Sequence, residues 1–253
     1  MASIDFFEEV SICVAYDKLL FMNANYQEEN PFETELVASE WSYSIENEKG
    51  MIRDKELYPL LSEWIKNTNA ENILDIGSGQ GICADRCVPD NMNYTGVEPS
   101  VFLTDRANEL YKKENRKFIL GNAFNLPVAT ASMDGVFSIN VWFHLENLDL
   151  AAKELSRVLK TKGVFFISTA NPDAYQVFED LYSESTKVGK KLVGKANVPV
   201  RAMSKNILYE HTMQEMKDSF EKHGLKILEI KSFGFAHLKT DKGLFVAIIG
   251  EKV

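Results

Sequence analysis

The stretch Asn72–Gly81, "NILDIGSGQG", places an apolar run directly before three glycines that are spaced two residues apart. The run has the length of a buried strand, and the glycines predict a turn whose backbone another group approaches closely. In doubly wound α/β sheets, the turn between the first strand and the first helix faces the ligand. The stretch therefore predicts a fold class and the position of a binding site.

Apolar strands alternate with helical segments after this stretch, which is the pattern of a parallel sheet covered by helices on both faces. A helix is predicted at 100–116, and another at 149–163 ends in a cationic turn with Gly163 as its stop. The predicted strands after the first lie at 93–100, 117–123, 135–141 and 163–170.

The C-terminal part begins with a T-x-x-E capping box, Thr212 and Glu215, and its helix ends at Gly224. Two strands, 225–234 and 242–253, then follow each other without a helix, which predicts an antiparallel hairpin added to the sheet. The prediction is an α/β fold with a doubly wound sheet of seven strands, mostly parallel, plus a helical cap.

Two segments lie outside the alternating pattern, residues 1–50 and 172–210. Because long structureless connections are uncommon in compact domains, we expect helices in both. The first is predicted to be an N-terminal helical lid. The second is predicted to be a substrate-cap insertion within a ligand-binding domain at 51–253.

Composition narrows the choice of partners and location. The 253 residues carry a net charge of −9, which disfavours general nucleic-acid binding, although 187–205 holds six basic and no acidic residues. The apolar runs are too short to span a bilayer, and Asp5, Glu8 and Glu9 are unlike a signal peptide. We expect a cytoplasmic chain without a membrane partner, a monomer or homodimer, whose three cysteines are reduced thiols that bind no metal.

The glycine spacing G-x-G-x-G differs from the dinucleotide fingerprint G-x-G-x-x-G, whose last position is Ile82 here. Glu98 follows Gly81 by 17 residues at the end of a predicted strand, where a carboxylate can accept both hydroxyls of a ribose. The residues alone thus indicate a nucleoside-containing ligand.

With its other motifs, the chain resembles the class I S-adenosylmethionine-dependent methyltransferases, in particular the small-molecule, methyltransferase type 11-like branch with its Rossmann-like sheet. "ILDIGSGQG" is similar to their first motif, "YTGVEPS" to the acidic second, and "GNAFNLP" to G-D-A-x-x-L-P. "MDGVFSINVWFHLENL" and "KELSRVLKTKG" are similar to their fourth strand and following helix. The likeness covers 52–253 and implies that the glycines face the amino-acid end of S-adenosylmethionine rather than a phosphate.

The resemblance also implies roles for individual residues. Asp75 would face the methionyl ammonium, Glu98 the ribose, and Asn122 the adenine, although the family usually has aspartate at this last position. Arg53 would clamp the methionine carboxylate, or it is a surface arginine. The cofactor residues predicted in this way are Arg53, Asp75, Gly77, Ser78, Gly79, Gly81, Glu98, Pro99, Asn122, Ala123, Phe124 and Asn140.

Methyl transfer needs alignment and a dry site, and a base only where the acceptor is weak. The resemblance makes His144 the candidate base, and the alternative is a histidine that bonds a loop backbone. Two other functions stay open: a tRNA-modifying methyltransferase that uses 187–205, and a regulator that binds S-adenosylmethionine or its product S-adenosylhomocysteine without catalysis. The predicted walls for a small-molecule O- or N-acceptor are Tyr26, Trp41, Tyr43, Trp142, Tyr209 and His211.

Overall fold

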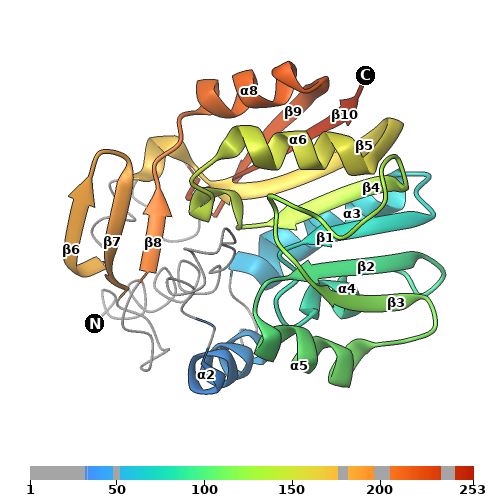
Figure 1. Cartoon of the computed structure of the whole chain (residues 1–253), viewed down its shortest axis with the longest axis horizontal. Coiled ribbons are helices and arrows are strands. Elements are labelled where there is room, and N and C mark those ends of the chain that lie inside the picture. Colours follow the sequence, from blue (N-terminus) through green and yellow to red (C-terminus); the bar gives the residue numbers. More distant parts are fainter. Residues whose placement is uncertain (1–31, 33, 48–51, 176–181, 197–205, 235–242) are drawn as a thin grey trace.

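A seven-stranded sheet forms the centre of the protein in this computed structural model (Figure 1). The structure describes residues 32, 34–47, 52–175, 182–196, 206–234 and 243–253. From one edge of the sheet to the other, the strands are β3 (Arg116–Leu120), β2 (Asn93–Glu98), β1 (Asn72–Ile76), β4 (Met133–Ile139), β5 (Leu159–Ala170), β10 (Phe245–Lys252) and β9 (Leu225–Phe233).

The strand directions confirm the predicted doubly wound sheet. β1 pairs in parallel with β2 and β4, β2 pairs in parallel with β3, and β4 pairs in parallel with β5. β10 is antiparallel to both of its neighbours, β5 and β9, as the predicted terminal hairpin requires. The strand order reverses between β1 and β4, so the carboxyl ends of these two strands flank the point where such folds bind ligands.

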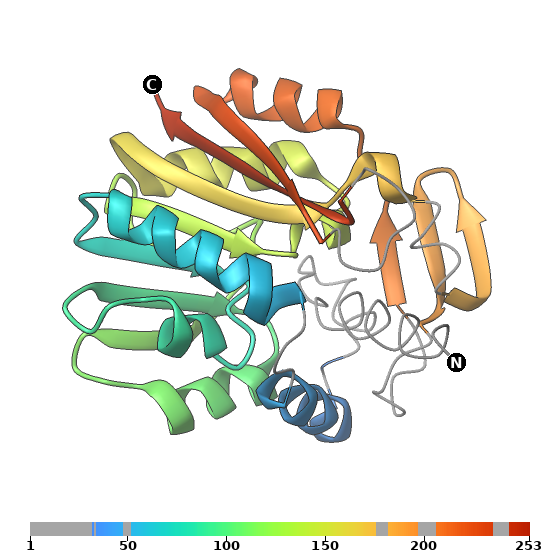
Figure 2. The same cartoon turned by 180° about the vertical axis from the view of Figure 1, so that it is seen from behind.

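Helices cover both faces of the sheet, with α6 and α8 on one face and α3 on the other (Figures 1 and 2). Strand β5 contacts helices on both faces, because neighbouring residues of a strand point to opposite sides of the sheet. The ring of Phe165 packs edge-on against Phe220 of α8, whereas Phe166 packs against Trp64 of α3. The helical elements are α2 (Glu35–Glu46), η2 (Arg53–Leu57), α3 (Tyr58–Asn67), α4 (Ile82–Arg86), α5 (Val101–Tyr111), η3 (Trp142–His144), α6 (Leu148–Val158), η4 (Pro172–Ala174) and α8 (Met213–Lys222).

The ends of two helices test the predicted stop signals. The capping box of α8 is present in both directions between Thr212 and Glu215, and Gly224 has the positive φ of 70° expected after a helix. The prediction that Gly163 ends the preceding helix is wrong. α6 ends at Val158, and Gly163 lies inside β5, where a Cβ would come within 2.8 Å of the Lys160 carbonyl oxygen. A close backbone approach at an irregular pairing of β5 therefore requires this glycine.

The insertion differs from its prediction as well. In the described part of the insertion, the short helix η4 (Pro172–Ala174) is followed by β6 (Tyr182–Val188), β7 (Lys191–Ala196) and β8 (Asn206–Tyr209), which form a three-stranded antiparallel sheet where we expect helices. Gly189, with φ of 60°, supplies the turn between β6 and β7. A short run ended by a glycine turn can pair locally as a hairpin, which the length of the connection alone does not indicate.

The N-terminal segment is described from Phe32 onward with gaps, and it contains α2, a helix within the predicted lid. The hydroxyl of Thr34 caps this helix by accepting from the backbone N–H of Val37. α2 lies beside α5 (Figures 1 and 2). Within the residues that the structure describes, no helix is long and apolar enough to cross a membrane.

Candidate functional site

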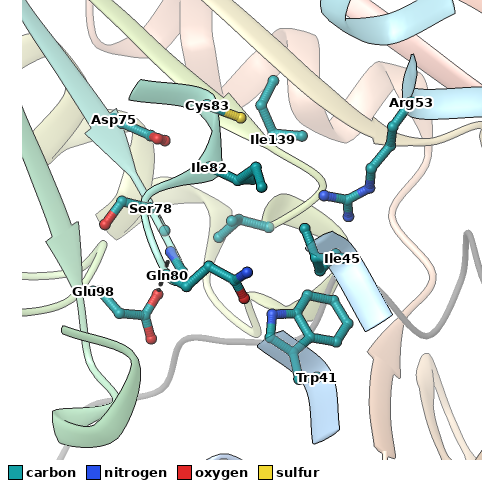
Figure 3. Close-up of a pocket in the computed structure, with 13 residues that line it drawn as sticks. Trp41, Ile45, Arg53, Asp75, Ser78, Gln80, Ile82, Cys83, Glu98 and Ile139 are labelled. Carbon is teal, nitrogen blue, oxygen red and sulfur yellow. Dashed lines mark hydrogen bonds between the residues drawn. The ribbon is translucent and has the colours of Figure 1, made fainter. Parts of the chain in front are cut away.

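A small cavity lies at the carboxyl ends of β1, β2 and β4 (Figure 3). It occupies the switch point of the sheet order, closed from the other side by α2 and η2. The lining residues among those described are Trp41, Ile45, Arg53, Asp75, Gly77, Ser78, Gly79, Gln80, Ile82, Cys83, Glu98, Ile139 and Val141.

The glycine turn connects β1 to α4, and its three glycines have positive φ angles of 81°, 54° and 87°. They serve different purposes. A Cβ on Gly79 would meet no atom within 4 Å and would project into open space, and Gly79 lines the cavity. A Cβ on Gly81 would lie 2.7 Å from the Phe118 ring, so packing requires that glycine. The expected approach of a ligand thus applies to Gly77 and Gly79, whereas Gly81 does not line the cavity.

Glu98 ends β2 with a side chain that is fully buried. One carboxylate oxygen accepts from the Gly79 N–H at 3.0 Å, and the other accepts from the Ser100 N–H at 2.9 Å. These two bonds hold the carboxylate at the cavity wall beside the glycine turn (Figure 3). Carboxylate oxygens are acceptors of the kind that bind ligand hydroxyls.

Asp75 lies at the other side of the glycine turn, and its side chain is almost completely buried. Its Oδ2 accepts from the Tyr94 hydroxyl at 2.8 Å. Burial opposes ionisation and raises the pKa of Asp75 to about 7, although the bond from Tyr94 lowers it. The carboxyl group can therefore change its protonation state near neutral pH.

Three buried oxygen atoms in this cavity have no hydrogen-bond partner among the described residues: Asp75 Oδ1, Ser78 Oγ and Gln80 Oε1. Two of them, the carboxylate and amide oxygens, act as acceptors when Asp75 is ionised. Because buried acceptors without donors are costly, a ligand with several N–H or O–H donors would stabilise this wall.

Arg53 lies on η2 with only 4% of its side chain exposed, so the alternative of a surface arginine is wrong. Its guanidinium points into the cavity from the wall opposite the glycine turn (Figure 3). The cavity thus contains a cationic group at one side and two carboxyl groups at the other. A zwitterionic ligand would match this distribution of charge.

Gln80 connects the glycine turn to α2 because its amide donates to the Ser42 carbonyl at 3.1 Å. Trp41 and Ile45, one helical turn apart on α2, complete the wall. We did not predict Ile45, Gln80, Ile82, Cys83, Ile139 or Val141 as lining residues. Most of these residues lie within or beside the glycine motif or the fourth-strand motif. This position in the sequence is a signal that could have identified them.

The residues predicted for the adenine do not line this cavity. The Asn122 oxygen, expected to accept from adenine, accepts instead from the N–H groups of Phe124 and Asn125, at 2.8 and 3.0 Å. The Asn122 side chain therefore orders its own loop, which also contains the buried Ala123. Pro99 is buried in a different loop, the one after β2.

Asn140 follows β4 with φ of 57°, an uncommon angle that an asparagine tolerates. Its side-chain oxygen accepts from the Ser168 hydroxyl at 2.5 Å, and it does not line the cavity. The observed contacts of Asn140 connect the ends of β4 and β5, and an approach to the methionyl end stays a prediction.

The predicted acceptor walls separate in the structure. Trp41 lines the cavity, whereas Tyr43, two residues later on α2, is 71% exposed and lies on another face of the helix. Trp142 is buried against Phe220, at 5.0 Å between ring centroids, so it belongs to the core. Tyr26 lies outside the described residues.

Two histidines join η3 to the inserted sheet by crossed hydrogen bonds. His144 Nδ1 lies 2.6 Å from the Ile207 carbonyl oxygen of β8, and His211 Nε2 lies 2.6 Å from the Leu145 carbonyl oxygen after η3. Burial lowers the pKa of His211. Tyr209, which is buried near His211, stacks on its ring. The alternative for His144, a histidine that bonds a loop backbone, is met only in part, because the backbone carbonyl that it contacts belongs to strand β8. None of the three residues lines the cavity.

The sheet order, the terminal antiparallel strand and the cavity at the glycine turn define the fold of the class I S-adenosylmethionine-dependent methyltransferases. The segment 74–167 matches the family described as "Methyltransferase domain".

Known proteins agree with this assignment. The O-methyltransferase rstn1 of Aspergillus nomiae is 25% identical over 134 residues, which are 48% of this chain and 60% of that protein. The chain spans about half the length of the first curated relatives it matches.

Among solved structures, the PH0226 protein of Pyrococcus horikoshii has a TM-score of 0.64 at 18% identity, covering 92% of this chain and all of the other. An S-adenosylmethionine-dependent methyltransferase of Mesorhizobium loti has a TM-score of 0.60 at 14% identity, covering 80% and 98%. At these identities the structural likeness supports the fold.

Proposed function

We propose that this protein is an S-adenosylmethionine-dependent methyltransferase that acts on a small-molecule acceptor. The observation that carries the proposal is the charge pattern of the cavity, with Arg53 on one wall and the unpartnered oxygens of Asp75 and Gln80 on another. The amino-acid end of the cofactor carries an ammonium and a carboxylate, which are the groups that such walls bind. A phosphate ligand would instead meet the two carboxyl groups of Asp75 and Glu98.

The residues present fit the ammonium, the carboxylate and the ribose of the cofactor. Asp75 and Gln80 would accept from the ammonium, Arg53 would bind the carboxylate, and Glu98 would accept from the ribose hydroxyls. When bound, S-adenosylmethionine supplies an electrophilic methyl group. Glu98 is already oriented by two backbone N–H groups, so little ordering is needed to bind a ribose.

The chain contributes alignment and the exclusion of water. Ile82, Ile139 and Val141 give the cavity an apolar wall next to its charged groups, and Trp41 and Ile45 of α2 close it. A dry site strengthens the interaction with a cationic ligand and favours the in-line geometry of methyl transfer. In this proposal α2 is part of the lid, and the sheet of β6, β7 and β8 is the acceptor cap.

His144 stays our candidate for a general base where the acceptor is an alcohol or phenol. If its Nδ1 carries the proton that bonds the Ile207 carbonyl, Nε2 is the basic nitrogen of the neutral ring. An uncharged amine acceptor would need no base, because it is already nucleophilic. The name of the relative rstn1 supports transfer to oxygen.

A tRNA substrate is less well supported by the described part of the basic segment. Lys187 pairs with Glu210 at 2.7 Å, and Lys190 pairs with Glu215. These carboxylates offset part of the positive charge that nucleic-acid binding would need. We therefore retain a cytoplasmic enzyme, a monomer or homodimer, with a small-molecule partner.

Calorimetry with S-adenosylhomocysteine tests the cofactor. We expect binding in the wild type, and a loss of about 1–3 kcal/mol of binding free energy in Glu98→Ala through the missing charged hydrogen bonds. Folded protein that binds NAD but not S-adenosylhomocysteine would contradict the proposal. Labelled S-adenosylmethionine and pooled metabolites, read by mass spectrometry, would identify the acceptor, and transfer of label would exclude a non-catalytic regulator.

A further inference from the structure

Tyr94 stands behind the cavity rather than in its wall. It lies on β2 in register with Ile73 of β1, and its side chain is 1% exposed. Its ring packs against Phe118 and Phe137, with centroid distances of 5.3 and 6.4 Å. These contacts hold the ring in the core, so the direction of its hydroxyl is fixed by packing.

The hydroxyl of Tyr94 donates to Asp75 Oδ2 at 2.8 Å. The other oxygen, Asp75 Oδ1, is buried in the cavity wall without a partner among the described residues. A carboxylate held at one oxygen by a rigid donor presents the other in a defined direction. Burial raises the pKa of Tyr94 well above its usual range, so the phenol stays a donor at any pH that a binding assay uses.

We propose that Tyr94 is a positioning residue for the cofactor: it aims Asp75 Oδ1 into the cavity and keeps the carboxylate ionised for a cationic group. The inference rests on the proposed function, because it assigns the ammonium of the cofactor to Asp75. Tyr94 itself touches no ligand in this scheme, and it acts through the bond to Asp75.

The other titratable or charged groups around Asp75 are Cys83 of α4, Arg53 of η2 and Glu98 of β2, which share its cavity. Hydrogen bonding with Cys87 and burial raise the pKa of Cys83 well above its usual range, so this thiol stays neutral. Burial places the pKa of Asp75 at about 7, and the bond from Tyr94 lowers it.

Tyr94→Phe removes the hydroxyl and keeps the packed ring, so it isolates the hydrogen bond. Losing a bond to a charged group should raise the ionisation midpoint of Asp75 by about one pH unit. We expect S-adenosylhomocysteine to bind the variant at least tenfold more weakly than the wild type below pH 6, with the ratio of dissociation constants falling by about pH 9 to a smaller, constant value that reflects the lost orientation of Oδ1. The amino group of the ligand titrates identically with both proteins, so it cancels in this ratio.

The controls separate positioning from a structural defect. In an Asp75→Asn background, Tyr94→Phe should change the affinity equally at all pH values, because no ionisation remains to be shifted. Tyr111→Phe, at a tyrosine beside the same glycine turn, should leave the affinity unchanged. A ratio for Tyr94→Phe that is the same from pH 5.5 to 9 would overturn the inference.

A second measurement does not need a ligand. Carbon-13 NMR of the Asp75 carboxyl group should show a midpoint about one pH unit higher in Tyr94→Phe than in the wild type. Equal midpoints would refute the role of Tyr94 whether or not the cofactor binds. Failure of the folded wild type to bind S-adenosylhomocysteine at any pH, with the midpoints still shifted, would refute the proposed function alone.

Discussion

Replacing Asp75 by asparagine should make the ligand-free protein more stable and at the same time weaken its affinity for the cofactor. Burial raises the pKa of Asp75 from 3.8 to about 7, so folding favours the protonated form. The resulting stabilisation is fully present below about pH 4 and is lost as the pH rises through 7. At pH 8 the ionised carboxylate costs the folded state about 4 kcal/mol, since each pKa unit corresponds to 1.36 kcal/mol.

Urea unfolding of the ligand-free wild type and Asp75→Asn would measure this cost. The neutral amide can still accept from the Tyr94 hydroxyl, so the variant should gain about 4 kcal/mol at pH 8 and about 2 kcal/mol at pH 5. Asp105→Asn, at an exposed carboxylate on α5, is the matched control and should show no such dependence on pH. Equal unfolding free energies of wild type and Asp75→Asn at pH 8 would refute the reasoning.

The same pair of proteins should respond oppositely to ligand. At a hundred times its dissociation constant, S-adenosylhomocysteine should stabilise the wild type by about 2.7 kcal/mol. Asp75→Asn should gain much less, because its amide cannot pair with an ammonium as a carboxylate does. A ligand effect of the same size in both proteins would show that Asp75 does not bind the cofactor.

Other changes test the remaining parts of the site. Gly79→Val should abolish S-adenosylhomocysteine binding in calorimetry because its side chain enters the cavity, whereas Gly189→Val, with a similar φ of 60° and equally open space, should retain it; binding by both variants would contradict the assigned cavity. His144→Ala should leave cofactor affinity unchanged and reduce methyl transfer, while His223→Ala should preserve both, and full turnover in His144→Ala would exclude the base. Thr212→Ala should lower the free energy of unfolding by about 1 kcal/mol through the lost cap of α8, compared with Gln214→Ala in the same helix. Hydrogen exchange in α2 should slow when S-adenosylhomocysteine is added, with α6 as the internal reference, and unchanged exchange in α2 would argue against a lid.

Local patterns were sufficient for the elements that line the cavity. "NILDIGSGQG" combines a buried strand with glycines at positive φ, and both are properties of a few neighbouring residues. The position of Glu98 could be predicted because the carboxyl ends of neighbouring parallel strands lie at the same edge of a sheet. A carboxylate at the end of β2 therefore lies near the turn that follows β1. Asp75, Gly77, Ser78 and Gly79 follow from the same stretch, and all line the cavity.

Contacts between distant segments could not be read in this way. The crossed bonds of His144 and His211 join residues more than 60 positions apart, and the Tyr94–Asp75 bond depends on the register of β1 with β2. Gly163 resembles a helix stop, but an irregular strand pairing uses it. Likewise, the strands of the insertion are stabilised by pairing with each other, which a single segment of sequence does not show.

The sequence by itself determined the doubly wound sheet, its antiparallel C-terminal strands and the glycine turn that faces a ligand, because periodicity and backbone sterics act locally. Only the tertiary structure decided which side chains meet in the cavity. The burial of Arg53, the packing of Gly81 against Phe118 and the raised pKa of Asp75 all depend on which residues of other elements lie around them. Desolvation and packing are properties of the assembled fold, so they are absent from any short stretch of the chain.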